Sequence, residues 1–179
     1  MRIAISGTHH AGKSTLVEEL SAVLPGYLTV EEPYHLLVED GHGFAEMPSV
    51  EDFELQLERS IECLSGDEPD ILFDRCPIDM LGYLLALAAG FPLKKWLPRV
   101  QAAIDTLDLI VFLPVEERDR IALSPSEDAD FRLDVDQKLK EIYFEDSLGL
   151  EMEVVEVAGT LRERVRQVLS RLRGKAAPL

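Results

Sequence analysis

The chain of 179 residues contains no asparagine and only two cysteines, Cys63 and Cys76. The missing asparagine excludes N-glycosylation, and two cysteines are too few for a disulfide framework, so we expect a reducing, cytoplasmic location. Basic residues are also scarce, since 18 lysines and arginines stand against 34 aspartates and glutamates and leave a formal net charge of −16. Nucleic acid and anionic membrane surfaces are bound through clustered positive charge, so we expect neither as a partner.

Long hydrophobic runs are absent too. No apolar segment approaches the roughly 20 residues of a membrane-spanning helix, and the apolar stretch within residues 1–7 is too short for a signal peptide. Internal repeats, low-complexity tracts and linkers are also missing. The length and a hydrophobic fraction of 46% are typical of one globular domain, which we place at residues 1–173, followed by a flexible tail at 174–179.

Apolar segments of strand length alternate along the chain with longer segments of helical periodicity. Strands are expected at residues 2–6, 27–31, 70–74, 108–113 and 151–157. Helices are expected at residues 13–24, 49–64, 78–89, 94–106, 115–123, 134–148 and 160–172, with residues 32–48 irregular. This alternation predicts an α/β fold in which a parallel sheet carries helices on both faces. Ligands of such sheets bind at the carboxyl ends of the strands.

The first expected strand is followed by Gly7-Thr8-His9-His10-Ala11-Gly12-Lys13-Ser14, which matches G-x-x-x-x-G-K-[ST]. Glycines let the backbone fold so that successive N–H groups converge on an anion, and the next helix directs its N-terminal dipole at the same anion. Lys13 is expected to reach the β- and γ-phosphates of ATP, and the Ser14 hydroxyl to bind Mg²⁺. The expected nucleotide-binding residues of this segment are Gly7, Thr8, His9, His10, Ala11, Gly12, Lys13, Ser14 and Thr15.

The two histidines of this loop invite a catalytic role. The simpler interpretation is that the side chains of His9 and His10 are partly exposed while the loop backbone binds the phosphates. No pair of histidines or cysteines with zinc-like spacing is matched by a second pair, so no structural zinc is expected.

Charged residues end two of the expected strands at the same sheet edge. Asp74 could hold Mg²⁺ directly or through water, or could cap the helix that follows. Arg75 could grip a phosphate or substrate oxygen, or form a plain ion pair. Glu32 could take a proton from an acceptor hydroxyl, and we prefer it to Glu31 because the strand should end there. Either glutamate could instead be an ordinary surface charge.

Arginines gather between two of the expected helices, at Arg118, Arg120 and Arg132. A mobile arginine-bearing lid is a common way to stabilise a transferring phosphoryl group while excluding water, whereas the alternative is a solvated, charged helix–loop–helix. After the last strand, Gly159 lies where a loop could back a nucleobase. Thr160 could equally be a simple helix cap.

Together these residues resemble the P-loop nucleoside and nucleotide kinase superfamily, from residue 2 to about residue 173. Glu32-Pro33 looks like the general-base position of deoxynucleoside kinases, and Phe73-Asp74-Arg75 resembles the acidic–arginine motif of those enzymes and of thymidylate kinases. Two departures stand out. Cys76 replaces the serine or tyrosine that is usual after the arginine, and the glutamine that reads a base in deoxynucleoside kinases is not evident on the helix at 49–65.

The run Asp74-Arg75-Cys76-Pro77-Ile78-Asp79, with Asp130-Phe131-Arg132 later, is closer still to the small AAA-type ATPase and kinase domains. That group includes the ribosylnicotinamide kinase domain of bacterial NAD regulators. The resemblance implies a three-layer P-loop NTPase fold whose five-stranded parallel sheet has the order 2-3-1-4-5. It also implies that Arg118, Arg120 and Arg132 belong to a lid.

The predicted function is therefore that of an ATP-dependent phosphotransferase. A P-loop kinase would transfer the γ-phosphoryl group of ATP, with Mg²⁺, to a small hydroxyl-bearing metabolite, with a nucleoside or nucleotide favoured. Two alternatives remain: a P-loop ATPase or regulatory module without an acceptor, and a kinase of a non-nucleoside small molecule. A GTPase-type switch is disfavoured because its guanine-reading motif resembles Asn-Lys-x-Asp, which a chain without asparagine lacks. A monomer or homodimer is expected.

Overall fold

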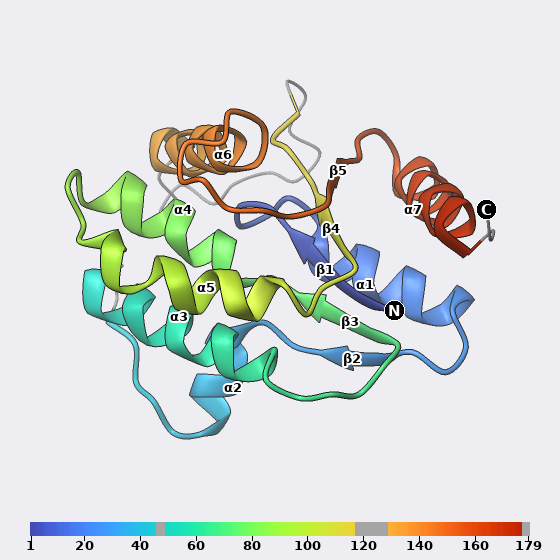
Figure 1. Ribbon diagram of the computed structural model, residues 1–179, viewed down its shortest axis with the longest axis horizontal. Coiled ribbons are helices and arrows are strands. Elements are labelled where there is room, and N and C mark those ends of the chain that lie inside the picture. Colours follow the sequence, from blue (N-terminus) through green and yellow to red (C-terminus); the bar gives the residue numbers. More distant parts are fainter. Residues whose placement is uncertain (46–48, 117–128, 177–179) are drawn as a thin grey trace.

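The computed structural model describes residues 1–45, 49–116 and 129–176 (Figure 1). Its centre is a five-stranded sheet of order β2-β3-β1-β4-β5, in which every neighbouring pair is parallel. The strands are β1 (Arg2–Ser6), β2 (Leu28–Val30), β3 (Ile71–Asp74), β4 (Leu109–Phe112) and β5 (Val154–Glu156). The predicted fold class and strand order are confirmed.

Helices cover both faces of this sheet. They are α1 (Lys13–Val23), α2 (Pro33–Glu39), α3 (Val50–Cys63), α4 (Pro77–Leu87), α5 (Leu97–Ile104), α6 (Ala129–Phe144) and α7 (Leu161–Ala176), with a short 3₁₀ turn, η1 (Leu93–Lys95), before α5. Within the described residues, no helix combines the length and the apolar character that crossing a bilayer requires.

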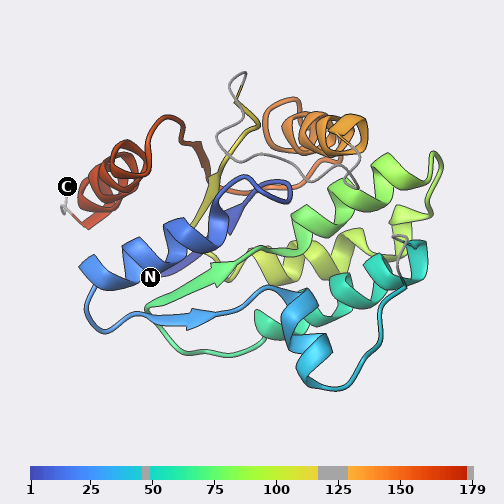
Figure 2. The same cartoon turned by 180° about the vertical axis from the view of Figure 1, so that it is seen from behind.

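Alternation along β1 decides which helices lie on which face. Ile3 and Ile5 belong to the apolar cluster shared with α1 and α7, whereas Ala4 belongs to the cluster shared with α3, α4, α5 and α6. Both views of the ribbon show α1 and α7 on one side of the sheet and α3 to α5 on the other (Figures 1 and 2). Because β1, β3 and β4 are buried along their whole length, the residues at 3–5, 71–73 and 109–112 within them are continuously apolar.

The region at 32–48, expected to be irregular, contains the helix α2. Pro33 occupies its first turn, where the missing N–H of proline needs no partner, and the preceding Glu32 is therefore extended. The glycines at positions 41 and 43 predicted a loop over this region, but the loop begins only after this two-turn helix. The consequence for the site is that Glu32 occupies the N-cap position of a helix at the carboxyl edge of the sheet, and its side chain makes no capping hydrogen bond there.

Other boundaries differ from expectation by a few residues. α6 begins at Ala129 and ends at Phe144, instead of covering 134–148, and α7 continues to Ala176, through the first residues of the expected tail. Residues 115 and 116 are not helical, and the rest of the helix expected at 115–123 lies outside the described residues. Arg118 and Arg120 lie there as well, so the arginine-bearing lid stays a prediction.

Candidate functional site

The segment between β1 and α1 has the backbone that its glycines allow. Gly7 has a φ of 143°, and a Cβ at this position would lie 2.5 Å from the carbonyl oxygen of Leu113, so no other residue fits. Gly12 is left-handed, with a φ of 86°, and directly precedes α1. His10 also has a positive φ, of 55°, which is uncommon for a residue with a side chain. We refer to residues 7–12 as the phosphate loop.

Lys13 begins α1 and lies against the phosphate loop. Its side chain is buried, and Nζ donates a hydrogen bond to the carbonyl oxygen of Thr8 at 2.8 Å. Burial, helped by the neighbouring Arg75 guanidinium, lowers the pKa of Lys13 to about 8. Within the described part of the chain, the one hydrogen-bond acceptor of this ammonium is a neutral carbonyl. A phosphate oxygen would bind it more strongly, because charge-assisted hydrogen bonds are the stronger kind.

Asp74 ends β3 beside this lysine. The carboxyl group is buried, and its Oδ1 has no hydrogen-bond partner among the described residues. Burial raises the pKa of Asp74, while Lys13 and the Ser14 hydroxyl act in the opposite direction. A buried carboxylate oxygen without a partner is costly unless a cation completes it, and oxygen ligands are those that Mg²⁺ prefers. Asp74 and Ser14 therefore fit a magnesium site, and they are the residues that would hold the ion.

The alternative role of Asp74 as a helix cap is not what the structure shows. The N-cap of α4 is Cys76, and the capping box is completed by Asp79 at the third helical position. Asp74 lies at the end of the strand and does not cap α4.

Arg75 follows Asp74 and joins two parts of the site. Its Nε donates to Oε2 of Glu32 at 2.6 Å, and its Nη1 donates to the carbonyl oxygen of Gly7 at 3.0 Å. The guanidinium carbon lies 5.4 Å from the centre of the Tyr83 ring, within range of a cation–π contact. Arg75 holds this position with a φ of 80°, a conformation that non-glycine residues rarely adopt. Of the two roles expected for Arg75, the structure shows the ion pair.

Glu32 faces the site, whereas its neighbour Glu31 is exposed. Burial alone would raise the pKa of Glu32, but the charges of Arg75 and Lys13 outweigh it and hold this pKa below its usual value. Nε2 of His35 lies 3.4 Å from the other carboxylate oxygen of Glu32. Glu32 is thus an ionised carboxylate at neutral pH, tied to the phosphate loop through one guanidinium.

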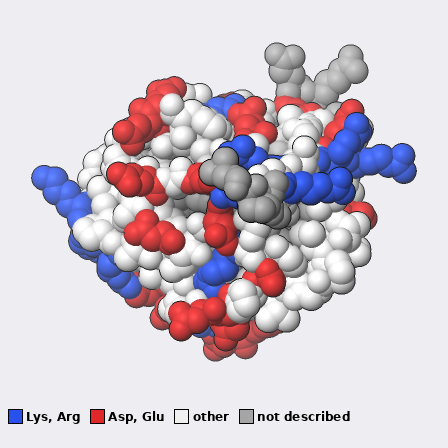
Figure 3. All heavy atoms as spheres, turned by 45° about the vertical axis from the view of Figure 1, so that its right-hand side comes forward, with Lys and Arg blue, Asp and Glu red and all other residues white. Residues whose placement is uncertain are grey.

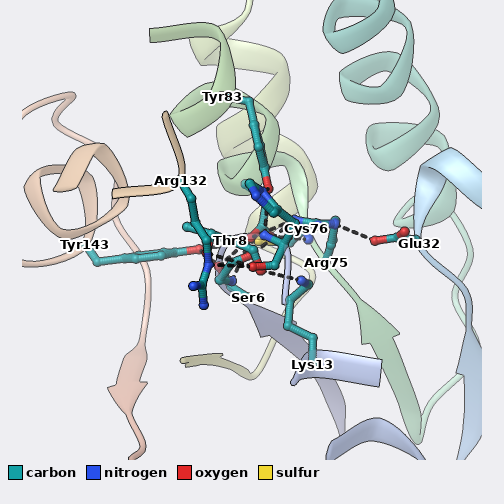
Figure 4. A network of polar contacts seen from close by, with 12 residues as sticks. Ser6, Thr8, Lys13, Glu32, Arg75, Cys76, Tyr83, Arg132 and Tyr143 are labelled. Carbon is teal, nitrogen blue, oxygen red and sulfur yellow. Dashed lines mark hydrogen bonds and ion pairs between the residues drawn. The ribbon is translucent and has the colours of Figure 1, made fainter. Parts of the chain in front are cut away.

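A buried carboxylate that sequence reasoning did not single out anchors the start of the loop. Oδ1 of Asp79 accepts from the Gly7 amide at 2.8 Å and from the Ser6 hydroxyl at 2.9 Å, and Oδ2 accepts from the Cys76 amide at 2.8 Å. The Ser6 hydroxyl also lies 2.6 Å from the Tyr143 hydroxyl of α6. Figure 4 shows Ser6, Cys76 and Tyr143 converging beside Thr8 of the loop. The capping-box spacing of Cys76 and Asp79 was the available signal, but nothing in the sequence pointed to Tyr143.

His9 contacts Tyr83 twice, through its amide at 2.8 Å and through Nδ1 at 3.1 Å from the tyrosine hydroxyl. Burial, then Arg75 and the other nearby cations, lowers the pKa of His9 to about 4. The imidazole is therefore neutral at pH 7, while the His10 side chain is exposed. The side chains of His9 and His10 are thus partly exposed and exposed, respectively, and phosphate binding by the loop backbone stays a prediction.

Arg132 and Gly159 are two further predicted site residues that the structure describes. Arg132 is buried on α6, and its guanidinium donates to the carbonyl oxygens of His9 at 3.0 Å and His10 at 3.4 Å. The Gly159 amide donates to Oε1 of Glu116 at 2.8 Å. Arg132 thus contacts the phosphate loop, and Gly159 contacts Glu116 in the segment after β4. The role of Arg132 in a lid and the role of Gly159 in contacting a base stay predictions.

Gln56 was also overlooked in the sequence. It is buried on α3, one turn from Phe53, whose ring stacks on Tyr83 with centroids 4.8 Å apart. Its Nε2 donates a 3.3 Å hydrogen bond to the Asp52 carbonyl of its own helix. A polar residue among the apolar positions 53, 57 and 61 of this helix was the signal that could have identified it.

The arrangement resembles that of solved kinases over almost the whole chain. Thymidylate kinase from Candida albicans matches with a TM-score of 0.67 and 18% identity, over 97% of this chain and 91% of the other. Deoxyadenosine kinase from M. mycoides, solved with bound dATP, matches with a TM-score of 0.65 and 18% identity, over 97% and 100%. Shikimate kinase from Aquifex aeolicus matches with a TM-score of 0.61 and 17% identity, over 98% of both chains. A search of curated protein sequences found no match.

The sheet order, the phosphate loop and these likenesses define the class: the chain has the α/β fold of P-loop kinases. The resemblance expected from the sequence is confirmed at the level of the fold. A family model described as an AAA domain matches residues 2–164, and the chain belongs to that family.

Proposed function

We propose that this protein is an ATP-dependent phosphotransferase that transfers the γ-phosphoryl group of ATP to a hydroxyl group of a small metabolite, with a nucleoside or nucleotide as the favoured acceptor. The observation that carries the proposal is the double attachment of Arg75, to the Glu32 carboxylate at 2.6 Å and to the phosphate-loop carbonyl of Gly7 at 3.0 Å. One guanidinium thereby fixes an ionised carboxylate beside the loop expected to bind the transferred phosphate. A carboxylate held there could accept the proton of an attacking hydroxyl group.

In the proposed reaction, Lys13 and the loop amides bind the phosphates. Ser14 and Asp74 would hold Mg²⁺, which when bound supplies positive charge to the phosphate oxygens. The acceptor hydroxyl gives its proton to a carboxylate oxygen of Glu32 while its oxygen forms a bond to the γ-phosphorus. The bond from that phosphorus to the β–γ bridging oxygen breaks, and ADP leaves. Arg75 stabilises the charge that moves across the phosphoryl group.

The charge of the site favours a neutral acceptor over an anionic one. Within the described residues, Arg75 is the cation nearest to Glu32, and that carboxylate already neutralises it. The formal net charge of −16 also leaves little positive surface to attract a second anion. Among the structural neighbours, deoxyadenosine kinase is named for a nucleoside acceptor and thymidylate kinase for a nucleotide. We therefore rank nucleosides first.

The test is ADP formation from ATP and Mg²⁺ with a panel of nucleosides, nucleotides and shikimate, and without any acceptor. We expect at least one acceptor to stimulate ADP formation and to appear phosphorylated by mass spectrometry. Glu32→Gln should lower the stimulated rate by about 10²-fold, the low end for general-base catalysis, whereas Glu31→Gln should have little effect. Equal ADP formation with and without every acceptor would identify an ATPase, and a larger loss in Glu31→Gln would mean that the wrong carboxylate was assigned.

A further inference from the structure

Cationic side chains bind the carbonyl groups of the phosphate loop one after another. Arg75 donates to the carbonyl oxygen of Gly7 at 3.0 Å, and Lys13 donates to that of Thr8 at 2.8 Å. Arg132 donates to the carbonyl oxygens of His9 at 3.0 Å and His10 at 3.4 Å. Arg164 donates to that of Ala11 at 2.7 Å. These four cations come from the segment after β3 and from α1, α6 and α7. The backbone of the loop is therefore held in its conformation by side chains from distant parts of the chain.

Among these four cations, Arg164 of α7 also contacts a segment outside the phosphate loop, the one that follows β4. Its Nη1 donates to the Ala11 carbonyl at 2.7 Å, and its Nη2 donates to Oε1 of Glu116 at 2.8 Å. The same carboxylate oxygen accepts the Gly159 amide at 2.8 Å. One guanidinium and one carboxylate thus connect the phosphate loop, the segment after β4 and the loop between β5 and α7.

The ion pair of Arg164 with Glu116 is largely shielded from solvent and closely packed. The Arg164 side chain is only 11% exposed. A Cβ on Gly12 would lie 3.2 Å from its Nη1, so the guanidinium lies directly against the turn into α1. A shielded, charge-assisted contact with two fixed partners holds its geometry far better than an exposed ion pair does.

The other arginines at this end of α7 behave differently. Arg162 and Arg166 are exposed, and within residues 1–45, 49–116 and 129–176 neither makes a hydrogen bond or an ion pair. The contacts of Arg164 are therefore a property of its position on the helix, and Arg166 provides a matched control.

We propose that Arg164 is a positioning residue that holds the phosphate loop and the loop at Gly159 at a fixed distance from each other, so that one nucleotide can contact both through its triphosphate and its base. The inference rests on the proposed binding of ATP. A ligand that spans both loops gains from their fixed spacing, because no ordering of the two loops is needed when it binds. A ligand that occupies the phosphate loop alone gains much less.

The test compares the binding of ATP with that of inorganic tripolyphosphate, each measured by titration calorimetry with Mg²⁺. In Arg164→Gln we expect ATP affinity to fall about tenfold, the usual size of a coupling between two sites, and tripolyphosphate affinity to fall clearly less. Arg164→Lys keeps the charge but can reach only one of the two partners, so its loss should be intermediate. Arg166→Gln should leave both affinities unchanged.

Each outcome decides one point. A role in stability alone would lower the melting temperature of Arg164→Gln without changing the ratio of the two affinities, and that result would overturn the inference. If the Arg164→Gln variant does not fold, the ratio of ATP affinity to tripolyphosphate affinity in Arg164→Lys provides the test instead. If the wild-type protein binds ATP and the ratio is unchanged, the positioning role is wrong and the proposed function stands. If the wild-type protein does not bind ATP, both are wrong.

Discussion

At the scale of single residues, the site is built from charges that are buried together. Lys13, Asp74 and Arg75 are close together and shielded from water. Arg75 lowers the pKa of both Lys13 and Asp74, while Asp74 raises the pKa of Lys13 and Lys13 lowers that of Asp74. Such clusters of shifted groups are typical of sites that bind or transfer charged ligands. The lowered pKa of Lys13 and the position of Asp74 each lead to a prediction.

The lowered pKa of Lys13 predicts opposite effects of pH on ATP binding and on stability. Above about pH 8 the lysine of the unbound protein loses its proton, so ATP affinity should fall, approaching about tenfold per pH unit. Between about 8 and the ordinary lysine value of 10.5 the unfolded chain binds more protons than the folded one, so the contribution of Lys13 to the free energy of unfolding rises with pH. Calorimetric titrations and urea unfolding from pH 7 to 10 measure the two trends. Lys13→Met should remove both, and trends that persist in that variant would assign them to another group.

Asp74→Asn is expected to affect turnover more than nucleotide affinity. The carboxylate lies where it would hold a metal ion, and a metal ligand acts mainly on the charge that develops during transfer. We expect a loss in kcat of about 10²-fold or more and a change in the dissociation constant of ATP of less than about tenfold. Steady-state kinetics with varied Mg²⁺ and parallel ATP titrations measure the two quantities. Wild-type kcat in the asparagine variant would contradict a metal-binding role.

At the scale of elements, the sequence predicted what periodicity and motifs encode locally. The strands and the phosphate loop were found because continuous apolar runs and the spacing of Gly7, Gly12 and Lys13 are local signals. The helix α2 was missed because its two turns lie next to glycines that suggest a loop. The partners of the loop, such as Arg164 on α7, could not be predicted, because a contact between residues 11 and 164 depends on how the helices pack and leaves no trace in spacing. The sheet order came from family resemblance.

The packing of α4 against α6 depends on Gly82. A Cβ there would lie 2.7 Å from Cδ2 and 2.9 Å from Cγ of Leu139, so the two helices approach each other through the missing side chain. Gly82→Val should lower the free energy of unfolding by about 1–3 kcal/mol through overpacking. It should also weaken ATP binding, because α6 carries Arg132, which holds the His9 carbonyl. Urea unfolding and ATP titration measure both effects.

Gly43→Val is the matched control for this substitution, since no atom of the described residues lies within 4 Å of a Cβ at position 43. We expect it to change stability by less than about 0.5 kcal/mol, the usual range for surface positions. A stable Gly82→Val variant with unchanged ATP affinity would show that α4 and α6 can separate without disturbing the loop.

At the scale of the whole molecule, the dominant feature is the formal net charge of −16. Acidic side chains spread over much of the visible surface, with basic ones gathered in fewer places (Figure 3). Like charges at this density repel each other and oppose the compact state, and dissolved salt screens that repulsion.

Salt should therefore stabilise the protein. Raising sodium chloride from about 0.05 to 0.5 M shortens the Debye length roughly threefold, and we expect the melting temperature to rise by about 2–5 °C. Lys13→Ala should show the same rise in scanning calorimetry, because the effect arises from the whole surface. A rise confined to the wild-type protein would instead indicate that an anion binds at the phosphate loop.

The support of the phosphate loop by residues from α1, α6, α7 and the segment after β3 limits how far its eight-residue motif can be treated as a module. Transplanting residues 7–14 into another sheet would carry over only one of the four cations that bind its carbonyl groups, Lys13. A fragment that ends before α7 would retain the entire motif and lose Arg164. A search for the motif therefore identifies a sequence that is able to form this loop, and a design that uses the motif supplies no more than that. The shape of the loop depends on the complete domain.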